Sequence, residues 1–310
     1  MTWQYIQPPF LKKGDEVVIL APAGKVVSTD IDHAATVLQQ WGLRPYLGKN
    51  LHQHLGSLAG SDQQRRQDLQ EALDSTTFRA IFCARGGYGT TRIVDSLDFT
   101  LFRKYPKWLI GFSDITALHL ALHQQQIQSI HAIMPIQFAK KDYQESLEQL
   151  RKVLFGEQLQ WCYRLPTDNY SKKGTAVAPL IGGNLSLLVN QLATSTMPNV
   201  ENKILFLEET GERLYHIDRM MTQLKRAGVL DDIVGLALGH FSINPNPDNE
   251  FHLSFQEIIL EKIMRPYPVA FGFPFGHQAP NYPLVCGAKA ILEVNSTVAS
   301  LSMFLHESLI

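Results

Sequence analysis

The feature that most restricts the fold of this chain is a regular alternation of short aliphatic runs and amphipathic stretches in its first half. Residues 16–21, 79–84 and 107–112 are aliphatic runs with the length of buried strands. Residues 31–41 and 65–73, which lie between them, follow helical patterns. Because strands that alternate with helices are joined by crossovers, this half predicts a Rossmann-like parallel sheet with helices on its faces.

The length of the chain predicts more than one domain. Domains usually contain about 100–200 residues, and this chain has 310. Between 140 and 174 the sequence becomes polar and loses the strand–helix alternation, which indicates a connection. We therefore expect an α/β protein with an N-terminal domain at 1–139, an inter-domain connection at 140–174 and a smaller C-terminal α/β (α+β) domain at 175–310.

The bulk composition argues against several classes of protein. The chain is 18% charged with a formal net charge of −1, so it lacks the field that would hold nucleic acid or an anionic membrane. The first residues show no secretory signal, and no apolar run approaches the roughly 20 residues that span a bilayer. The three cysteines are far apart and outside any CxxC spacing, which disfavours a zinc site or a disulfide framework. We expect a cytoplasmic protein that acts on a small molecule.

A serine lies at the corner between a predicted strand and a predicted helix. The run at 107–112 leads into Ser113-Asp114, and residues 115–124 continue as a helix. This placement exposes the Ser113 hydroxyl at the carboxyl end of a strand, where open α/β sheets bind ligands. It also puts the Asp114 amide at a helix N-terminus, where it can stabilise a developing oxyanion. Two interpretations stay open: a nucleophile elbow that lacks the second glycine of G-x-S-x-G, or a side chain that caps the helix.

A glycine-rich turn, Arg85-Gly86-Gly87-Tyr88-Gly89, follows directly after the strand at 79–84. Its glycines can adopt positive φ and let backbone N–H groups approach a ligand closely. The spacing differs from that of the G-x-G-x-x-G and P-loop motifs. An oxyanion-binding turn, a phosphate-binding turn and a plain tight turn therefore all stay open.

Two further strand ends carry polar side chains. Glu208 and Glu209 end the apolar run at 203–207, where a buried carboxylate needs a partner. His277 follows the apolar run at 269–273 in a loop of glycine and proline, and such loops often carry catalytic groups. Solvated acids and a structural histidine are the alternative interpretations.

Together these parts support nucleophilic catalysis by serine more strongly than each of them does alone. A serine hydroxyl attacks readily when an imidazole takes its proton, and the imidazole needs a carboxylate that fixes its tautomer. Ser113, Glu208 and His277 supply these groups, all at strand ends. His119 and His123 are four residues apart on a predicted helix, but no H-E-x-x-H motif accompanies them, so we expect no metal site.

The motifs of this chain resemble those of the LD-carboxypeptidases, a family that includes murein tetrapeptide carboxypeptidases and microcin C immunity peptidases. The resemblance covers nearly the whole chain, and seven motifs in the same order make it highly specific. They are Ala21-Pro22-Ala23-Gly24, Arg85-Gly86-Gly87-Tyr88-Gly89, Gly111-Phe112-Ser113-Asp114, Gly182-Gly183-Asn184-Leu185, Leu205-Phe206-Leu207-Glu208-Glu209, Asp218-Arg219-Met220 and Phe275-Gly276-His277.

The resemblance implies a serine carboxypeptidase whose catalytic residues are Ser113 as nucleophile, His277 as base and Glu208 as the acid that orients the histidine. Family members use the first acid after the apolar strand, which selects Glu208; the second position is often aspartate, so Glu209 departs mildly from the pattern. The backbone N–H groups of Gly87 and Asp114 are implied as the oxyanion hole.

The implied reaction is hydrolysis of the amide before a C-terminal D-amino acid through an acyl-enzyme, without a metal or cofactor. In peptidoglycan recycling this removes D-alanine from murein tetrapeptide. The resemblance places the active site at the interface of the two domains, and it implies a homodimer. Arg85, Tyr88 and Arg219 are candidates for substrate binding; each arginine offers a bidentate fork to a carboxylate, although Arg219 fits a structural ion pair equally well.

Two other functions stay open. A hydrolase like the microcin immunity peptidases acts on aminoacyl-nucleotide conjugates and needs an aromatic platform for adenine, for which Trp161 is a candidate. A non-catalytic metabolite-binding protein would hold phosphate at the turn of residues 85–89, although the nucleotide-binding motifs are missing.

Overall fold

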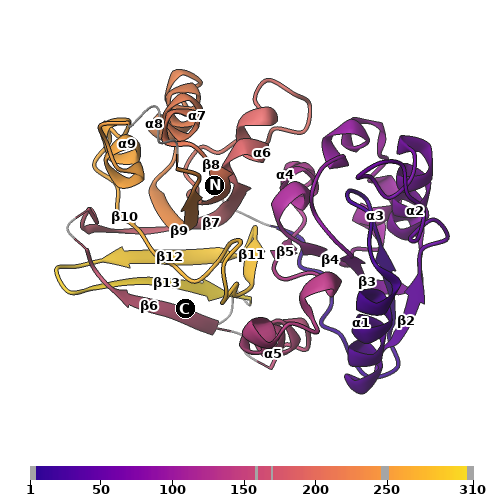
Figure 1. Cartoon of the computed structure of the whole chain (residues 1–310). Helices are drawn as coiled ribbons and strands as arrows, with labels where there is room; N and C mark the ends of the chain where they lie inside the picture. Colours follow the sequence, from indigo (N-terminus) through magenta and orange to yellow (C-terminus); the bar gives the residue numbers. More distant parts are fainter. Residues whose placement is uncertain (1–4, 158–159, 169, 246–250, 306–310) are drawn as a thin grey trace.

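The chain folds around two β-sheets that lie side by side, as its computed structural model shows (Figure 1). The structure describes residues 5–157, 160–168, 170–245 and 251–305. Within these ranges the first sheet has six strands and the second has seven. No helix in the same ranges is both long enough and apolar enough to cross a bilayer.

The first sheet contains the parallel strands that the alternating pattern predicts. In sheet order its strands are β11 (Leu284–Cys286), β5 (Ser129–His131), β4 (Trp108–Gly111), β3 (Phe78–Cys83), β1 (Glu16–Leu20) and β2 (Arg44–Leu47). β1 to β5 run parallel, whereas β11 comes from far along the chain and pairs antiparallel with β5. The sequence pattern does not predict β11, because three residues are too few to show a period.

Helices cover both faces of the first sheet, because successive strand residues point to opposite sides. The helices of this half are α1 (Ser28–Gln40), α2 (Asp62–Asp74), α3 (Thr100–Lys104) and α4 (Thr116–Gln124). Val17 and Ile19 of β1 pack in one buried cluster with residues of α1. Val18 and Leu20 of the same strand pack in another with residues of α2 and α4. This layering confirms the α/β fold expected for the N-terminal half.

The second sheet combines a parallel part with an antiparallel part. In sheet order its strands are β10 (Val269–Ala270), β9 (Gly235–Ile243), β8 (Ile204–Glu212), β7 (Gly174–Asn184), β12 (Lys289–Val294), β13 (Val298–Phe304) and β6 (Gln160–Pro166). β7 to β10 run parallel, and β12, β13 and β6 continue the sheet antiparallel. The helices α6 (Leu185–Asn190), α7 (Leu214–Arg226), α8 (Val229–Asp232) and α9 (Phe255–Glu261) lie beside the parallel part (Figure 1).

Two strands of this sheet differ in length from the apolar runs that predict them. β8 continues past its apolar run because its polar end still pairs with β9, with Glu209 opposite Phe241 and Thr210 opposite Ser242. β10 is shorter than the run at 269–273, in which Gly272 adopts a φ of 85° that a strand does not accept. Backbone pairing and backbone geometry therefore set these ends rather than hydrophobicity.

The segment at 140–174, expected as an inter-domain connection, contains regular structure. It includes α5 (Gln144–Leu154) and β6, the edge strand that pairs with β13. α5 buries Leu147, Leu150 and Leu154 on one side and exposes polar side chains on the other. The helical spacing of Leu147, Leu150 and Leu154 is present in the sequence, but β6 lies at the sheet edge and shows no apolar run.

The two sheets are joined by packing and by a short connection. One buried cluster includes Ile110 and Ile130 from the first sheet and Leu180 and Phe206 from the second. β11, at the edge of the first sheet, is followed almost directly by β12 of the second. Side chains at the ends of β4 and β8 can therefore meet at the junction.

Candidate active site

Ser113 forms a strained corner between β4 and α4. Its φ is 63°, in the left-handed region that residues other than glycine rarely adopt. A 3₁₀ turn, Ser113–Ile115, leads into α4, and neither this turn nor α4 has a side-chain cap. The helix-capping interpretation of Ser113 and Asp114 is therefore wrong. Strain of this kind persists only where the surroundings hold it, and it is frequent at functional sites.

Three side chains from distant parts of the chain form a chain of hydrogen bonds. His277 Nε2 lies 3.0 Å from Ser113 Oγ, and His277 Nδ1 lies 2.6 Å from Glu208 Oε2. An ionised carboxylate only accepts, so Nδ1 carries the proton in the neutral imidazole. Nε2 is then free to accept the hydroxyl proton of Ser113, which is the arrangement that nucleophilic catalysis by serine requires.

The surroundings of His277 favour its charged form despite its burial. The side chain of Glu208 is 0% exposed and that of His277 is 23% exposed. Burial lowers the pKa of His277, but the hydrogen bond and charge of Glu208, together with the charge of Glu209, outweigh it and raise the pKa above its ordinary value. The protonated form of His277 is therefore stabilised at this position.

Glu209, the second acid of the strand end, points to a different set of partners. Its carboxylate accepts from Asn184 Nδ2 at 2.9 Å and from the backbone N–H groups of Ser186 and Thr210, each at 2.8 Å. Burial raises the pKa of Glu209, and the charge of Glu208 adds to this effect. Glu208 is therefore the acid that reaches His277, while Glu209 holds the end of β7 and the start of α6.

The glycine-rich turn packs directly against the serine corner. A Cβ on Gly86 would lie 2.9 Å from the Cβ of Ser113, so only glycine fits there. Gly87 has a φ of 106°, which also favours glycine. Thr90, just after the turn, donates from its N–H and its hydroxyl to Asp114 Oδ2 at 2.8 and 2.5 Å. The side chain of Asp114 thus ties the turn to the corner.

Arg65 is a buried cation that the sequence interpretation overlooked. Its Nη1 donates to the backbone carbonyls of Pro22 and Gly89, at 2.5 and 2.8 Å, and its Nη2 contacts Asp62. It therefore joins the loop after β1 to the glycine-rich turn. A signal existed, because Arg65 lies on the same helical face as Leu69 and Leu73, at i, i+4 and i+8.

The three candidates for substrate binding lie at exposed positions. Arg85 is exposed and its Nη1 donates to the carbonyl of Lys25 at 3.0 Å. Tyr88 is 56% exposed. Arg219 is exposed on α7, with its guanidinium 5.5 Å from the centre of the Tyr215 ring. The side chain of Trp161, proposed as a platform for adenine, lies outside the described residues.

The two histidines on α4 are engaged within the protein. His119 contacts Ser129 Oγ and the carbonyl of Gly111, each at 2.8 Å, and burial lowers its pKa to about 4. His123 contacts the hydroxyl of Tyr5. Within the described ranges, no group of three histidine, cysteine or acidic side chains is placed to hold a metal ion.

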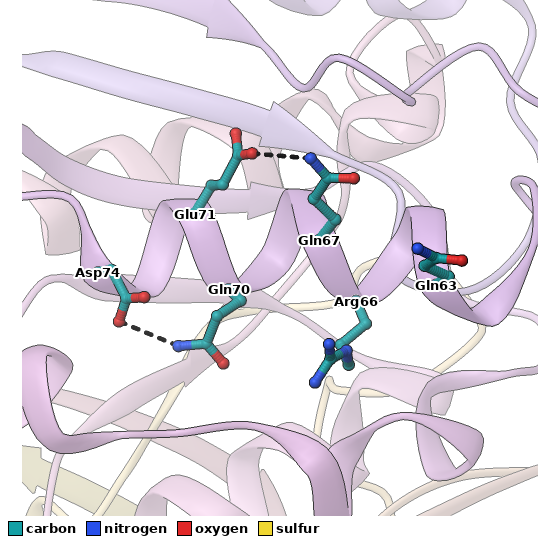
Figure 2. Close-up of a pocket in the computed structure, with 6 residues that line it drawn as sticks. All are labelled: Gln63, Arg66, Gln67, Gln70, Glu71 and Asp74. Atoms are coloured by element: carbon teal, nitrogen blue, oxygen red, sulfur yellow. Dashed lines mark hydrogen bonds between the residues drawn. The ribbon is translucent and has the colours of Figure 1, made fainter.

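A shallow hollow lies apart from these groups, on the surface of α2. Its lining consists of the polar residues Gln63, Arg66, Gln67, Gln70, Glu71 and Asp74. Figure 2 shows that the amides of Gln67 and Gln70 bond to Glu71 and Asp74 of the same helix. The hollow contains none of the candidate functional residues from the sequence analysis, and its lining is a solvated face of α2.

The chain matches one protein family in two consecutive parts. Residues 17–132 match the LD-carboxypeptidase N-terminal domain, and residues 177–292 match the LD-carboxypeptidase C-terminal domain. The chain belongs to the LD-carboxypeptidase family. This membership confirms the resemblance drawn from the seven motifs. It also makes the protein a hydrolase of the carboxypeptidase type, so the interpretation as a non-catalytic binding protein loses its support.

Relatives and solved structures support this assignment, because their similarity to this LD-carboxypeptidase extends over nearly the whole chain. The probable murein peptide carboxypeptidase of Bacillus subtilis (strain 168) is 35% identical over 297 residues, which cover 94% of this chain and 93% of the relative. A muramoyltetrapeptide carboxypeptidase from Oxalobacter formigenes has a similar structure, with a TM-score of 0.83 and 27% identity over 93% of this chain and 98% of that one. An MccF-like protein from Bacillus anthracis str. Ames gives a TM-score of 0.85 and 25% identity over 97% and 100%.

Proposed function

We propose that this LD-carboxypeptidase releases D-alanine from murein tetrapeptide, with Ser113 as nucleophile, His277 as general base and Glu208 as the group that orients and stabilises His277. The observation that carries the proposal is the pair of hydrogen bonds from Glu208 through His277 to Ser113. The names of the similar enzymes from Bacillus subtilis and Oxalobacter formigenes support the substrate.

The geometry supports a two-step reaction. Ser113 Oγ attacks the carbonyl before the terminal D-alanine while His277 Nε2 takes its proton. His277 then gives this proton to the amine of the leaving D-alanine, and an acyl-enzyme stays on Ser113. Water, deprotonated by the same imidazole, hydrolyses the ester and restores the hydroxyl.

The developing oxyanion needs donors close to Ser113. The backbone N–H groups of Gly87 and Asp114 are the proposed pair, because the turn packs against the corner and Asp114 directly follows the serine. Backbone donors held in place need no reorganisation during the reaction, and losing one such donor typically costs about 10²–10³ in turnover. The bonds from Thr90 to the Asp114 side chain hold both pieces of backbone in this arrangement.

Incubation with murein tetrapeptide, followed by assay of free D-alanine, tests this function. Wild type is expected to release D-alanine, and Ser113→Ala is expected to release none. Release by both proteins would contradict the role of Ser113. If neither releases D-alanine but a fluorophosphonate labels the wild type at Ser113, the nucleophile stands and the substrate is wrong; aminoacyl-nucleotide conjugates are then the next substrates to assay.

Two predictions about the whole protein accompany this function. We propose a cytoplasmic enzyme that works as a homodimer, as the family resemblance implies. Light scattering on the purified protein distinguishes a dimer from a monomer directly. Fractionation of cells that express the full chain tests the location.

A further inference from the structure

We propose that the α5 segment (residues 143–154) positions His277 against Ser113 and so links the two halves of the site, with Tyr143 and Ser146 as the positioning residues. This inference rests on the proposed roles of Ser113 and His277. The α5 segment lies between the two parts of the chain that match the family, 17–132 and 177–292.

His277 belongs to an irregular loop between β10 and β11. A backbone bond from the Tyr282 N–H to the Pro274 carbonyl, 2.8 Å long, closes this loop. Gly276 adopts a φ of 118°, so the chain turns sharply just before the histidine. A loop without a regular hydrogen-bond ladder needs contacts from elsewhere to hold one conformation.

The first such contact runs through two buried residues, Asn281 and Ser146. Asn281 Oδ1 accepts from the Gly276 N–H at 3.0 Å, and the Asn281 N–H donates to Ser146 Oγ at 2.9 Å. Both residues are 0% exposed. Breaking a buried hydrogen bond of this kind leaves a polar group without a partner, so the contact holds the two ends of the loop firmly.

The second contact reaches the histidine itself. The hydroxyl of Tyr143 donates to the backbone carbonyl of His277 at 3.1 Å. The neighbouring Glu145 contacts the hydroxyl of Tyr282, at the far end of the loop. Three residues within about one helical turn, Tyr143, Glu145 and Ser146, therefore contact the same loop.

The other end of the α5 segment is attached to the N-terminal half of the molecule. The Leu11 N–H donates to the Leu154 carbonyl at 2.8 Å. Phe155 packs edge-on against Trp41, which follows α1, with the ring centres 6.4 Å apart. Figure 1 shows α5 at the junction of the two halves. The segment thus fixes a loop of the C-terminal half relative to the half that carries Ser113.

This arrangement has a catalytic consequence. Ser113 and His277 come from different halves, so their 3.0 Å contact depends on how the halves are held together. A misplacement of about 1 Å can cost roughly 10²-fold in rate even when its cause lies away from the reacting atoms. Tyr143 and Ser146 act on rate through the position of His277 and are not expected to touch the substrate.

The variants Tyr143→Phe, Ser146→Ala and the double variant test this role, with Tyr267→Phe as a matched control. The Tyr267 hydroxyl also donates to a backbone carbonyl, that of Leu230 at 2.9 Å, and both residues lie outside the histidine loop. We expect each single variant to lose roughly threefold to tenfold in kcat, the effect of one net hydrogen bond, and the double variant to lose more. KM is expected to change by less than about twofold in each variant, because the variants leave the contacts that hold the bound substrate unchanged. The control is expected to match wild type.

The rate of fluorophosphonate labelling separates this inference from the proposed function. Labelling of Ser113→Ala at the wild-type rate would overturn the proposed nucleophile. If only Ser113 reacts in the wild type and the double variant reacts at the wild-type rate with unchanged kcat, positioning by the α5 segment is wrong. A loss that vanishes when rates are corrected for the folded fraction, measured by thermal unfolding, overturns it as well. Should the double variant not fold, Tyr143→Phe alone decides, since it removes one oxygen from a partly buried ring.

Discussion

The corner of Ser113 and the loop of His277 are held in very different ways. The corner lies between two regular elements, β4 and α4, and Asp114 is tied to Thr90, only 24 residues away. The loop of His277 is irregular, and its contacts reach back 69 residues to Glu208, 134 to Tyr143 and 164 to Ser113.

This difference teaches which part of the site depends on local structure. A strand followed directly by a helix needs a corner between them, and the glycine-rich turn packed against Ser113 holds this one in its strained conformation. A loop of glycine and proline takes its conformation from what packs around it. Loss of one contact near Ser113 should therefore be limited by the flanking strand and helix, whereas loss of one contact near His277 should displace the loop.

The largest expected effect tests the two residues themselves. Ser113→Ala removes the nucleophile and His277→Ala removes its base, and loss of either group in a serine peptidase costs about 10⁶-fold in kcat. D-alanine release from murein tetrapeptide measures the loss, and thermal unfolding checks that both variants still fold. If either variant retained wild-type turnover, the proposed mechanism would fail.

A smaller effect is expected from a methyl group next to the histidine. A Cβ at Gly276 would lie 2.9 Å from the Cβ and 3.0 Å from the Oε2 of Glu208. Gly276→Ala should therefore push Glu208 and His277 apart and lower kcat by about 10²-fold.

Gly272→Ala is the matched control for this steric effect. Gly272 also has a positive φ, 85°, but a Cβ there would meet nothing within 4 Å. Both variants bear backbone strain from a positive φ, and thermal unfolding measures how much stability each one loses. Equal losses of activity in the two would show that strain, and not contact with Glu208, is responsible.

The pH dependence distinguishes the two ways in which the surroundings act on His277. The base must be neutral to take a proton, so kcat/KM should fall about tenfold per pH unit below the pKa of His277. Glu208 raises this pKa against the lowering effect of burial. The acidic limb of the wild type should therefore lie above pH 6.5, the ordinary value for histidine.

In Glu208→Gln the His277 imidazole loses its hydrogen bond to a charged carboxylate, while the burial that lowers its pKa is unchanged. The acidic limb of the surviving activity should then move to lower pH. Fluorophosphonate labelling across the pH range measures both proteins without dependence on the natural substrate. A limb that stays in place would mean that Glu208 does not control the charge of His277.

The smallest expected effect lies at the corner. Thr90→Val removes the hydroxyl that bonds Asp114 but keeps the backbone N–H bond to the same oxygen. One lost hydrogen bond predicts a decrease in kcat of roughly threefold to tenfold. Thr90→Ser keeps the hydroxyl and should behave like wild type. A loss above about 100-fold in Thr90→Val would show that the corner depends on the Thr90 hydroxyl more than on the flanking β4 and α4.

Much of the fold could be predicted from the sequence, because the aliphatic runs record burial directly. The strands β1, β3, β4 and the helices beside them follow from the spacing of apolar residues. The strands β11 and β6 could not be predicted in the same way, since β11 has three residues and β6 lies at an exposed edge. Pairing partners far along the chain make these segments into strands.

The candidate site shows the same division. Glu208 and Glu209 are adjacent and look alike in the sequence, where only the family resemblance selected Glu208. The structure brings Glu208 to His277 and turns Glu209 to Asn184, because neighbouring strand residues point to opposite sides. Arg65, Thr90 and Tyr143 belong to no motif. Arg65 and Tyr143 donate to backbone carbonyls and Thr90 donates to the Asp114 side chain, and no sequence pattern identifies these partners.

The sequence by itself determined the parallel sheet, the corner at Ser113 and the identity of the polar groups at the strand ends. These depend on local periodicity and on backbone preferences within a few residues. Only the tertiary structure decided which acid faces the histidine and which helix supports the histidine loop. It also decided how the two halves bring His277 Nε2 to 3.0 Å from Ser113 Oγ. Hydrogen bonds between distant residues are set by packing of the whole chain, and that packing has no signature in any short stretch of sequence.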